Sequence, residues 1–309
     1  MKRTERFFSQ NQDADRWLVV GAAGFLGRAI SAELSARKCD VLGAGRSAPS
    51  SSPLPGRSWR TLDVFDAENL RDLVREWRPT VLINALGHSP ATSGPALKDF
   101  YVQSTRLLLE TIQTAKPDCR VVLLGSAAEY GNALRPGGSL ESDPARPLSE
   151  YGRAKCAQFE CAESFSNHGL AITTARLFNP VGPGQGRHLF AASLMERIRR
   201  GERSLRVHSA NHVRDWIDVR DAARALVTLA GSPQPPSVLN ICTGIGETVG
   251  RVATEIGRLA GVELELEPGE TTADVLWHSL GDPARMFQLG WRPQHGLSES
   301  LADQWRHFL

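Results

Sequence analysis

The sequence predicts an α/β protein: a doubly wound parallel sheet of Rossmann-like type with a smaller C-terminal lobe. Three observations lead to this fold class. Apolar runs of strand length alternate with segments of helical periodicity over the first part of the chain. A glycine-rich turn joins the first of these strands to the first helix. Beyond about residue 180 the alternation becomes less regular, which indicates a second lobe.

Composition is ordinary for a globular protein, with 41% apolar and 23% charged residues among 309. The formal net charge of +2 gives no global field that would recruit nucleic acid or an acidic membrane surface. The longest apolar runs, such as Val121 to Leu124, are far too short to cross a bilayer. We therefore expect neither a nucleic-acid nor a membrane partner.

Met1 to Arg16 is polar and charged without an apolar core, so we read it as a flexible extension and not as a secretory signal. Five scattered cysteines lack the spacing of a zinc site or a disulfide framework. This cysteine usage predicts no metal and fits a reducing cytoplasm.

A strand is expected at Arg16–Val20, then a turn with the spacing Gly-x-x-Gly-x-x-Gly, then a helix to about Arg37 and a strand over 40–44. Glycines let a backbone approach a pyrophosphate, and the helix N-terminus offers free N–H groups to that anion. The alternative is a purely structural turn. The residues expected to bind a dinucleotide here are Gly21, Gly24, Phe25, Leu26 and Gly27.

The end of the second strand reports which dinucleotide is preferred. An acidic residue there would accept hydrogen bonds from the ribose of NAD, whereas an arginine accommodates the 2′-phosphate of NADP. No Asp or Glu stands at this strand end, but Arg46 does. NADP(H) is therefore the preferred cofactor, NAD(H) remains possible, and the alternative is that Arg46 is a solvated loop residue.

A third strand, 58–62, leads to Asp63 and Val64, both expected beside the adenine end of the cofactor. Asp63 could instead cap the helix expected over 67–77. A fourth strand, 80–83, leads to small residues and then His88, which is a candidate substrate contact or a surface loop residue. Ala85, Leu86 and Gly87 would line the cofactor.

A helix over about 96–115 and a strand over 120–124 follow, and the strand runs directly into Ser126. Ser126 thus emerges at the carboxyl end of a central strand, although a turn serine would look the same. Tyr151 and Lys155 are four residues apart at the start of a helix that runs to about Asn167, so they share one face. A nearby ammonium lowers the pKa of a tyrosine, which would make Tyr151 an acid or base near neutrality. The alternative is an exposed amphipathic pair.

The strand over 170–177 ends at Phe178-Asn179-Pro180, and shorter elements follow it. These are helices over 189–200, 218–229 and 248–260 and strands over 205–207 and 238–242. The expected division is an extension (1–16), a cofactor-binding domain (17–180, with 210–243 returning to it) and a substrate-binding lobe (181–209 and 244–309).

Together, the glycine turn, Asp63, Ser126, Tyr151-x-x-x-Lys155, Arg176 to Pro180 and Arg214 to Val219 follow the order and spacing of a known family. The chain resembles the extended short-chain dehydrogenase/reductases, that is, the NAD-dependent epimerase/dehydratase family. Locally, residues 178–185 and 214–220 look most like the GDP-4-keto-6-deoxy-sugar reductases.

The resemblance implies a role for each matching residue. Ser126 would hydrogen-bond the reacting oxygen, Tyr151 would give or take its proton, and Lys155 would hold the nicotinamide ribose. Asn179 and Arg214 match positions that meet a substrate diphosphate. The remaining positions that the resemblance places beside the cofactor are Leu177 and Pro180.

Three departures from the family pattern narrow the chemistry. Ala127 and Ala128 stand where sugar dehydratases carry adjacent acids, and Glu129, one position later, is expected to be structural. Tyr101 stands where the family usually has asparagine, and Thr271 where it often has an arginine for the diphosphate. The two alanines argue against dehydration and favour a reductase, and Tyr101 would alter the floor of the active site. Thr271 weakens the case for a nucleotide sugar, although Arg214 remains.

We therefore expect an NADP(H)-dependent reductase of a keto group on a nucleotide-activated deoxysugar. The alternatives are a nucleotide-sugar epimerase with tightly bound NAD(P), a ketoreductase acting on a substrate without a nucleotide, and a non-catalytic cofactor-binding regulator. By the same resemblance, helices 96–115 and 151–167 would pair with a second copy in a four-helix dimer interface.

Overall fold

The computed structural model describes residues 15–48, 57–88, 92–202 and 205–308. The expected N-terminal extension lies almost entirely outside the described residues, as does most of the Ser- and Pro-rich stretch around residues 47–55. None of the described helices is long and apolar enough to span a membrane.

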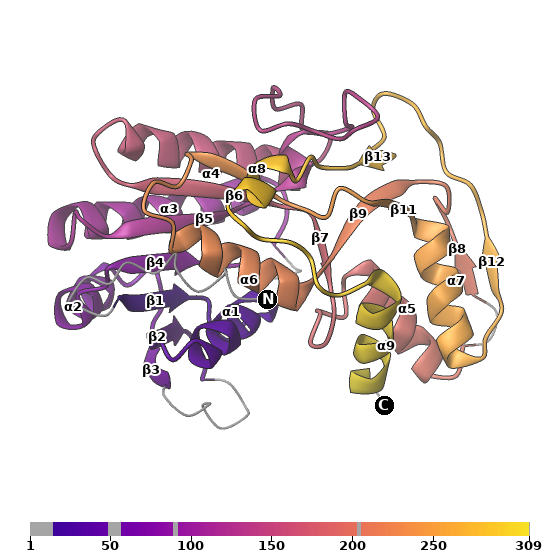
Figure 1. Ribbon diagram of the computed structural model, residues 1–309, viewed down its shortest axis with the longest axis horizontal. Helices are drawn as coiled ribbons and strands as arrows, with labels where there is room; N and C mark the ends of the chain where they lie inside the picture. The colour runs from indigo at the N-terminus through magenta and orange to yellow at the C-terminus, as the bar shows by residue number, and fades with distance from the viewer. Residues whose placement is uncertain (1–14, 49–56, 89–91, 203–204, 309) are drawn as a thin grey trace.

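A seven-stranded parallel sheet organises the larger part of the molecule (Figure 1). Its strand order is β10-β6-β5-β4-β1-β2-β3, so the chain starts near the middle and winds outward in both directions. The strands are β1 (Arg16–Val20), β2 (Asp40–Gly45), β3 (Arg57–Thr61), β4 (Val81–Asn84), β5 (Arg120–Ser126), β6 (Ile172–Leu177) and β10 (Val238–Ile241). This arrangement confirms the predicted doubly wound fold.

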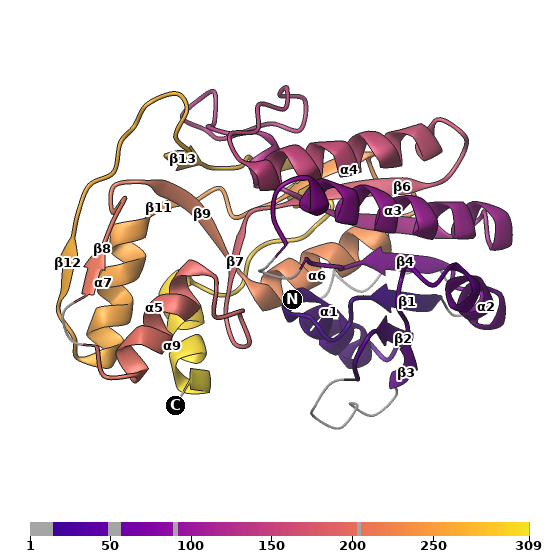
Figure 2. The ribbon, with the colours of Figure 1, turned by 180° about the vertical axis from the view of Figure 1, so that it is seen from behind.

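Helices cover both faces of this sheet (Figure 2). Successive side chains of a strand point to opposite faces, so Trp17 and Val19 of β1 enter one apolar core while Leu18 and Val20 enter the other. The helices on the first face are α1 (Phe25–Ala36) and α6 (Val219–Ala230), and those on the second are α2 (Ala67–Trp77), α3 (Pro95–Ala115) and α4 (Glu150–Ser166).

The smaller lobe is built on a mixed sheet and its own apolar core. β9 (Val213–Asp218) lies centrally and pairs with β7 (Asn179–Val181), β11 (Gly246–Thr248) and β13 (His278–Ser279). A separate pair joins β8 (Leu205–Val207) to β12 (Leu264–Leu266). The helices that pack here are α5 (Phe190–Arg199), α7 (Val249–Ala260) and α9 (Leu297–Phe308).

One segment differs from the expected division of the chain. Residues 210–243 were expected to return to the main sheet, and α6 and β10 do so. β9, however, joins the mixed sheet, where Asn179 to Val181 pair with Trp216 to Asp218. The expected division treated residues 210–243 as one block and named no strand over 213–218, so it did not anticipate this pairing.

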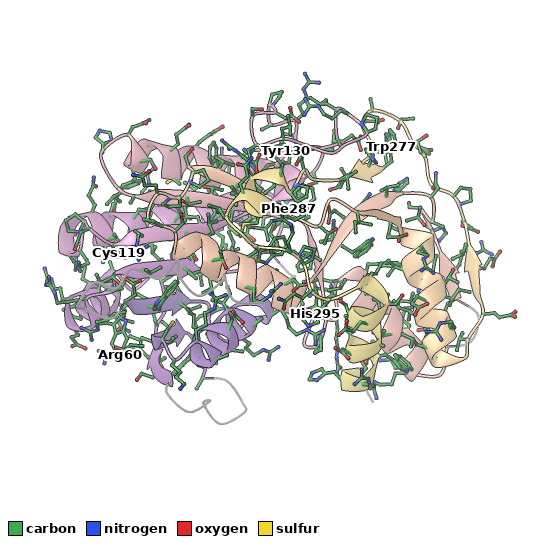
Figure 3. The ribbon with its side chains drawn as sticks, viewed as in Figure 1. Arg60, Cys119, Tyr130, Trp277, Phe287 and His295 are labelled. Atoms are coloured by element: carbon green, nitrogen blue, oxygen red, sulfur yellow. The ribbon has the colours of Figure 1, made fainter. Side chains whose placement is uncertain are left out.

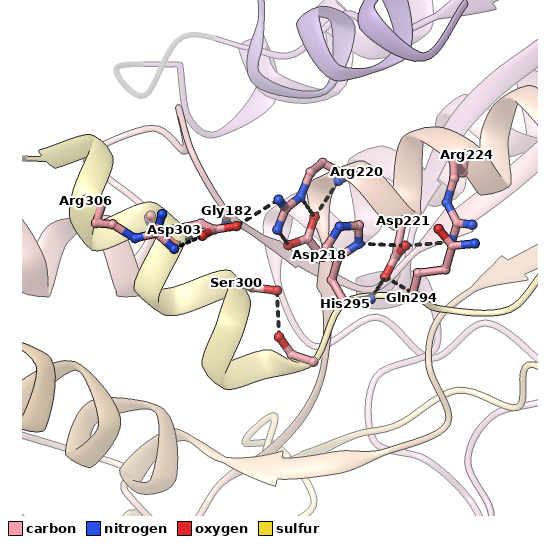
Figure 4. Close-up of polar contacts among 12 residues, drawn as sticks. Gly182, Asp218, Arg220, Asp221, Arg224, Gln294, His295, Ser300, Asp303 and Arg306 are labelled. Carbon is pink, nitrogen blue, oxygen red and sulfur yellow. Dashed lines mark hydrogen bonds and ion pairs between the residues drawn. The ribbon is translucent and has the colours of Figure 1, made fainter. Parts of the chain in front are cut away.

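Buried carboxylates tie the C-terminal segment to α6 (Figure 4). Asp221 is fully buried, receives backbone N–H groups from Gln294 and His295 at 2.9 and 2.8 Å, and pairs with Arg224 at 2.6 Å. Arg220 bridges Asp218 and Asp303, the latter in α9. The end of the chain therefore closes the small lobe against the large one.

Candidate active site

The glycine-rich turn lies at the carboxyl end of β1, and its geometry requires glycine at two positions. Gly21 has φ +82°, and a Cβ there would lie 2.7 Å from the Ala85 carbonyl oxygen. A Cβ on Gly27 would lie 2.2 Å from the carbonyl oxygen of Gly21. The turn is thus folded tightly against the end of β4, leaving a cradle that side chains would fill.

The start of α1 suits an anion. Gly24 is its N-cap and has no side chain to occupy the first-turn N–H groups, which belong to Phe25, Leu26 and Gly27. The loop after β7 returns to this end of α1, where Arg28 donates to the Gly184 carbonyl at 3.2 Å. The residues therefore fit the pyrophosphate of a dinucleotide, with both lobes contributing to the site.

The adenosine end of the expected cofactor site lies at β2 and β3. Arg46 is exposed immediately after the last residue of β2. Asp63 accepts the Phe65 N–H at 3.1 Å, whereas Asp66 caps α2 through Asn69. The capping alternative for Asp63 is thereby removed. Val64, next to it, is buried in the second core.

The end of β4 passes below the turn. Asn84 accepts the Leu86 N–H through its side chain, which fixes the backbone just before Gly87. His88 is half-buried and its Nδ1 lies 2.9 Å from the Tyr101 hydroxyl, so it is held against α3 and is not a free surface residue.

Ser126 and Tyr151 are brought together by close packing of two short segments. Ser126 ends β5 and accepts the Ala128 N–H at 3.2 Å, which turns the chain into a 3-10 turn, η1 (Ala127–Glu129). A Cβ on Gly152 would lie 2.4 Å from the Ala128 carbonyl oxygen, so only glycine lets α4 approach η1 this closely. Tyr151 consequently hydrogen-bonds with the Ser126 side chain.

The pKa of Tyr151 differs from the expectation. Burial raises the pKa of this phenol, and hydrogen bonds from Ser126 and Tyr101 oppose that effect without overcoming it. Lys155 does not lower it here because its ammonium points elsewhere. It donates to the Leu124 carbonyl at 2.6 Å and to Gln158 Oε1 at 2.7 Å.

Lys155 is nevertheless a central feature of the site. Its Nζ lies 4.2 Å above the centroid of the Tyr101 ring, a cation–π contact. Burial lowers the pKa of Lys155 to about 8, with Glu129 opposing the shift. Sequence reasoning missed Gln158, which also donates to Thr105 at 3.0 Å and so links α4 to α3. Its spacing of three residues from Lys155 on a helix is the signal that could have found it.

Glu129 is structural, as expected. It is fully buried, accepts the Ser126 N–H at 2.7 Å and pairs with Arg176 at 2.7 Å. Burial disfavours the Arg176 charge, but attraction to Glu129 and Tyr130 outweighs burial and raises the pKa of Arg176. The Glu129–Arg176 pair therefore holds the backbone of Ser126 in place through the Ser126 N–H.

On the small-lobe side, Asn179 donates to the Asp215 carbonyl at 3.0 Å. Arg214 donates to two backbone carbonyls, those of Val213 and Leu276, at 2.8 and 2.7 Å. Among the residues that the structure describes, Arg214 has no carboxylate in ion-pair contact. A partly buried guanidinium without a counterion is suited to bind an anion.

Two further predicted contacts lie where the lobes meet. Leu177 ends β6 opposite Ser126 in register, and the Pro180 carbonyl accepts from Gln185 at 2.7 Å.

Trp277, labelled in Figure 3, stacks on His278 at the β13 side of the small lobe. Burial, and then the Arg214 charge, lower the pKa of His278.

The chain is similar to known proteins over nearly its whole length. The chain is 30% identical over 305 residues to the dTDP-6-deoxy-L-talose 4-dehydrogenase (NAD(P)(+)) of Kitasatospora kifunensis, covering 94% of each chain. It is 25% identical to the GDP-6-deoxy-D-mannose reductase of Pseudomonas aeruginosa, covering 93% of this chain and 94% of that one.

Among solved structures, the Thermus thermophilus UDP-glucose 4-epimerase in complex with NAD superposes with a TM-score of 0.82 at 26% identity, covering 95% of this chain and 98% of that one. A model of the NAD dependent epimerase/dehydratase family matches residues 17–242. With its parallel sheet, glycine cradle and Ser126–Tyr151–Lys155 set, this chain belongs to the NAD-dependent epimerase/dehydratase family and is an NAD(P)-dependent enzyme of that family.

Proposed function

We propose that the protein is an NADP(H)-dependent reductase that reduces a keto group, at C4, of a nucleotide-activated deoxysugar. The observation that carries this proposal has two parts. Ser126 and Tyr151 are hydrogen-bonded to each other, and the two residues that follow Ser126 are both alanine. A reacting oxygen can be held and protonated there, but Ala127 and Ala128 offer no acid or base for removing water.

The raised pKa of Tyr151 supports its proposed role as a proton donor. A phenol with a raised pKa is protonated at neutral pH, and it can therefore act as a proton donor. When bound, the nicotinamide cofactor supplies the hydride. Ser126 and Tyr151 hold the carbonyl oxygen, and Tyr151 gives it a proton as negative charge develops there.

Two relatives support the substrate class. The names of the Kitasatospora and Pseudomonas enzymes place their chemistry on a dTDP- and a GDP-linked deoxysugar, and the first is a 4-dehydrogenase. Arg214 supplies the cation for the diphosphate of such a substrate in this chain, although Thr271 removes a second anchor.

The direct test follows NADPH absorbance with purified protein and a panel of nucleotide-linked 4-keto-6-deoxyhexoses, with NADH in parallel. Consumption of NADPH with one of these substrates is the expected result. Conversion of the sugar without net change in cofactor, together with NAD(H) that stays bound through purification, would instead identify an epimerase. Absence of both reactions would contradict a nucleotide-sugar substrate.

Arg46 is the residue on which the NADP preference rests. Replacing Arg46 by Ala removes a bidentate phosphate partner at the end of β2, and we expect the KM for NADPH to rise by about ten-fold. The KM for NADH should stay within about two-fold, because NADH lacks the 2′-phosphate. Equal changes for both cofactors would assign Arg46 no role in the choice.

The proposal of a diphosphate-bearing substrate depends on Arg214. Replacing Arg214 by Met should raise the KM for the nucleotide sugar by about 10- to 100-fold, since a charge-assisted contact of about 1.5–3 kcal/mol is lost. Arg71→Met, on the exposed side of α2, is the matched control. An unchanged KM in Arg214→Met would show that the substrate anion binds elsewhere.

The proposal includes a cytoplasmic homodimer. α3 and α4 lie side by side on one face of the molecule (Figure 2), and two copies could bring four helices together through them. Light scattering at micromolar concentration should give twice the mass of 33.7 kDa. A monomer would contradict this part of the proposal.

A further inference from the structure

Two aromatic side chains lie against Tyr151 without a role in the mechanism above. The ring centroids of His88 and Tyr101 lie 5.7 and 6.0 Å from that of Tyr151, and 5.7 Å from each other. They come from three separate places in the fold: the end of β4, the first half of α3 and the first turn of α4. All three rings therefore converge on one point.

Polar atoms connect these rings. Tyr101 is only 3% exposed, so its hydroxyl needs partners inside the protein, and it finds one in His88 Nδ1 at 2.9 Å. The Tyr101 and Tyr151 hydroxyls also hydrogen-bond to each other, and Tyr151 in turn bonds to Ser126. The result is a continuous chain from Ser126 through Tyr151 and Tyr101 to His88.

The outer end of this chain meets water. His88 is half-buried, whereas Tyr101 is closed off by its neighbours. Imidazole has two nitrogens, so it can release a proton from one while it takes up another at the second. His88 is therefore a link between solvent and a buried phenol.

From this arrangement we propose that Tyr101 and His88 form a proton relay that returns a proton to Tyr151 after each turnover. The inference rests on the proposed function, because only a net reduction consumes a proton. Tyr101 stands where an asparagine is usual in the family, so the route would be a property of this chain.

Each proton that leaves Tyr151 is replaced from water. Reduction of one carbonyl takes up one hydride and one proton, and the proton leaves the Tyr151 hydroxyl for the new alcohol oxygen. The Tyr101 O–H bond then breaks and a Tyr151 O–H bond forms. His88 gives its Nδ1 proton to Tyr101 and takes one from water at Nε2, which restores the number of protons. Exchange with water then returns the imidazole proton from Nε2 to Nδ1 before the next turnover.

The electrostatic surroundings keep His88 uncharged at rest. Burial, and then His188 from the loop after β7 and Lys155 from α4, lower the pKa of His88. Lys155 also lies over the Tyr101 ring, and Glu129 acts on both Lys155 and Tyr151. A neutral His88 can donate at one nitrogen and accept at the other, as the relay requires.

The kinetic test uses Tyr101→Phe and His88→Ala. Tyr101→Phe keeps the ring beneath Lys155 but removes the hydroxyl, so kcat should fall by about ten-fold or more while KM changes little. The solvent deuterium isotope effect on kcat should rise, because proton return becomes limiting. His88→Ala should show the same loss, and added imidazole should restore part of kcat, a response that a structural defect would not give.

The double variant Tyr101→Phe/His88→Ala should be no slower than the slower single variant, because both remove one route. His168 is an exposed histidine just after the C-terminal end of α4. The control His168→Ala should keep the wild-type kcat, and added imidazole should not change it. Wild-type kcat in Tyr101→Phe, additive losses, or no rescue of His88→Ala would each overturn the relay.

A readout without turnover separates this inference from the proposed function. The chain has eight histidines, so NMR of labelled imidazoles can follow each one, with His88→Gln assigning its signal. Tyr151→Phe leaves the Tyr101–His88 contact intact, yet it should shift the His88 titration midpoint by ~0.3 pH unit or more if the three groups form one chain. An unchanged His88 midpoint would contradict a hydrogen-bonded connection from Tyr151 to His88, even if the protein proves to be the proposed reductase.

Discussion

Replacing Tyr151 by Phe is expected to lower turnover by about 10²- to 10⁴-fold, the usual contribution of a positioned general acid. The hydroxyl that this change removes is the one bonded to Ser126 and Tyr101. The ring itself should keep its contacts with His88 and Tyr101, so the fold and cofactor binding should persist. Steady-state kinetics together with a fluorescence titration of NADPH would measure both.

Tyr130→Phe provides a matched control, because the chain has only three tyrosines. Tyr130 is also buried, but its hydroxyl donates to Asn240 at 2.8 Å, and the Arg176 guanidinium lies over its ring. It should lose some stability and little activity. Full turnover in Tyr151→Phe would remove Tyr151 from the chemistry, and loss of NADPH binding in that variant would point to a structural defect instead.

Replacing Glu129 by Gln is expected to lower the free energy of unfolding by about 3–5 kcal/mol, because it leaves the Arg176 charge buried without a counterion. The Glu129 carboxylate is almost fully inaccessible and Arg176 is 4% exposed. The same carboxylate also accepts the Ser126 N–H, so catalysis should suffer as Ser126 loses its support. Urea unfolding followed by tryptophan fluorescence would measure the loss.

The exposed pair of Arg206 and Glu265 offers the comparison. Glu265→Gln removes one partner of an ion pair whose side chains are more than half exposed, and the expected change is within about 1 kcal/mol. Equal effects of Glu129→Gln and Glu265→Gln would show that the buried pair contributes no more to stability than a surface one.

Much of the fold follows from local pattern. Strands such as β1 are short apolar runs between turn residues, and Gly21 and Gly27 are required by backbone geometry that the spacing already implies. The position of Ser126 at the carboxyl edge of the sheet follows from the strand order. For these features, sequence and structure carry the same information.

What pattern could not give is the direction of individual side chains. The spacing of Tyr151 and Lys155 predicts a shared helix face, yet the Lys155 ammonium turns to the Leu124 carbonyl and Gln158. The contact between His88 and Tyr101 joins segments whose meeting depends on how α3 packs against the sheet. The direction of Lys155 depends on its rotamer, and the contact between His88 and Tyr101 depends on long-range packing. Neither rotamers nor long-range packing produce a periodic pattern in the sequence.

The carboxylates of α6 that hold the C-terminal segment also bear on how the protein is made. During synthesis, Asp221 cannot bind the N–H groups of residues 294 and 295 until they have been made, and Arg220 cannot pair with Asp303 until then either. The ribosome makes the two Asp221 partners 73 and 74 positions after Asp221, and it makes Asp303 later still. The large sheet can condense while synthesis continues, but the contacts that join α6 to the C-terminal segment form only after residues 294–303 have been made.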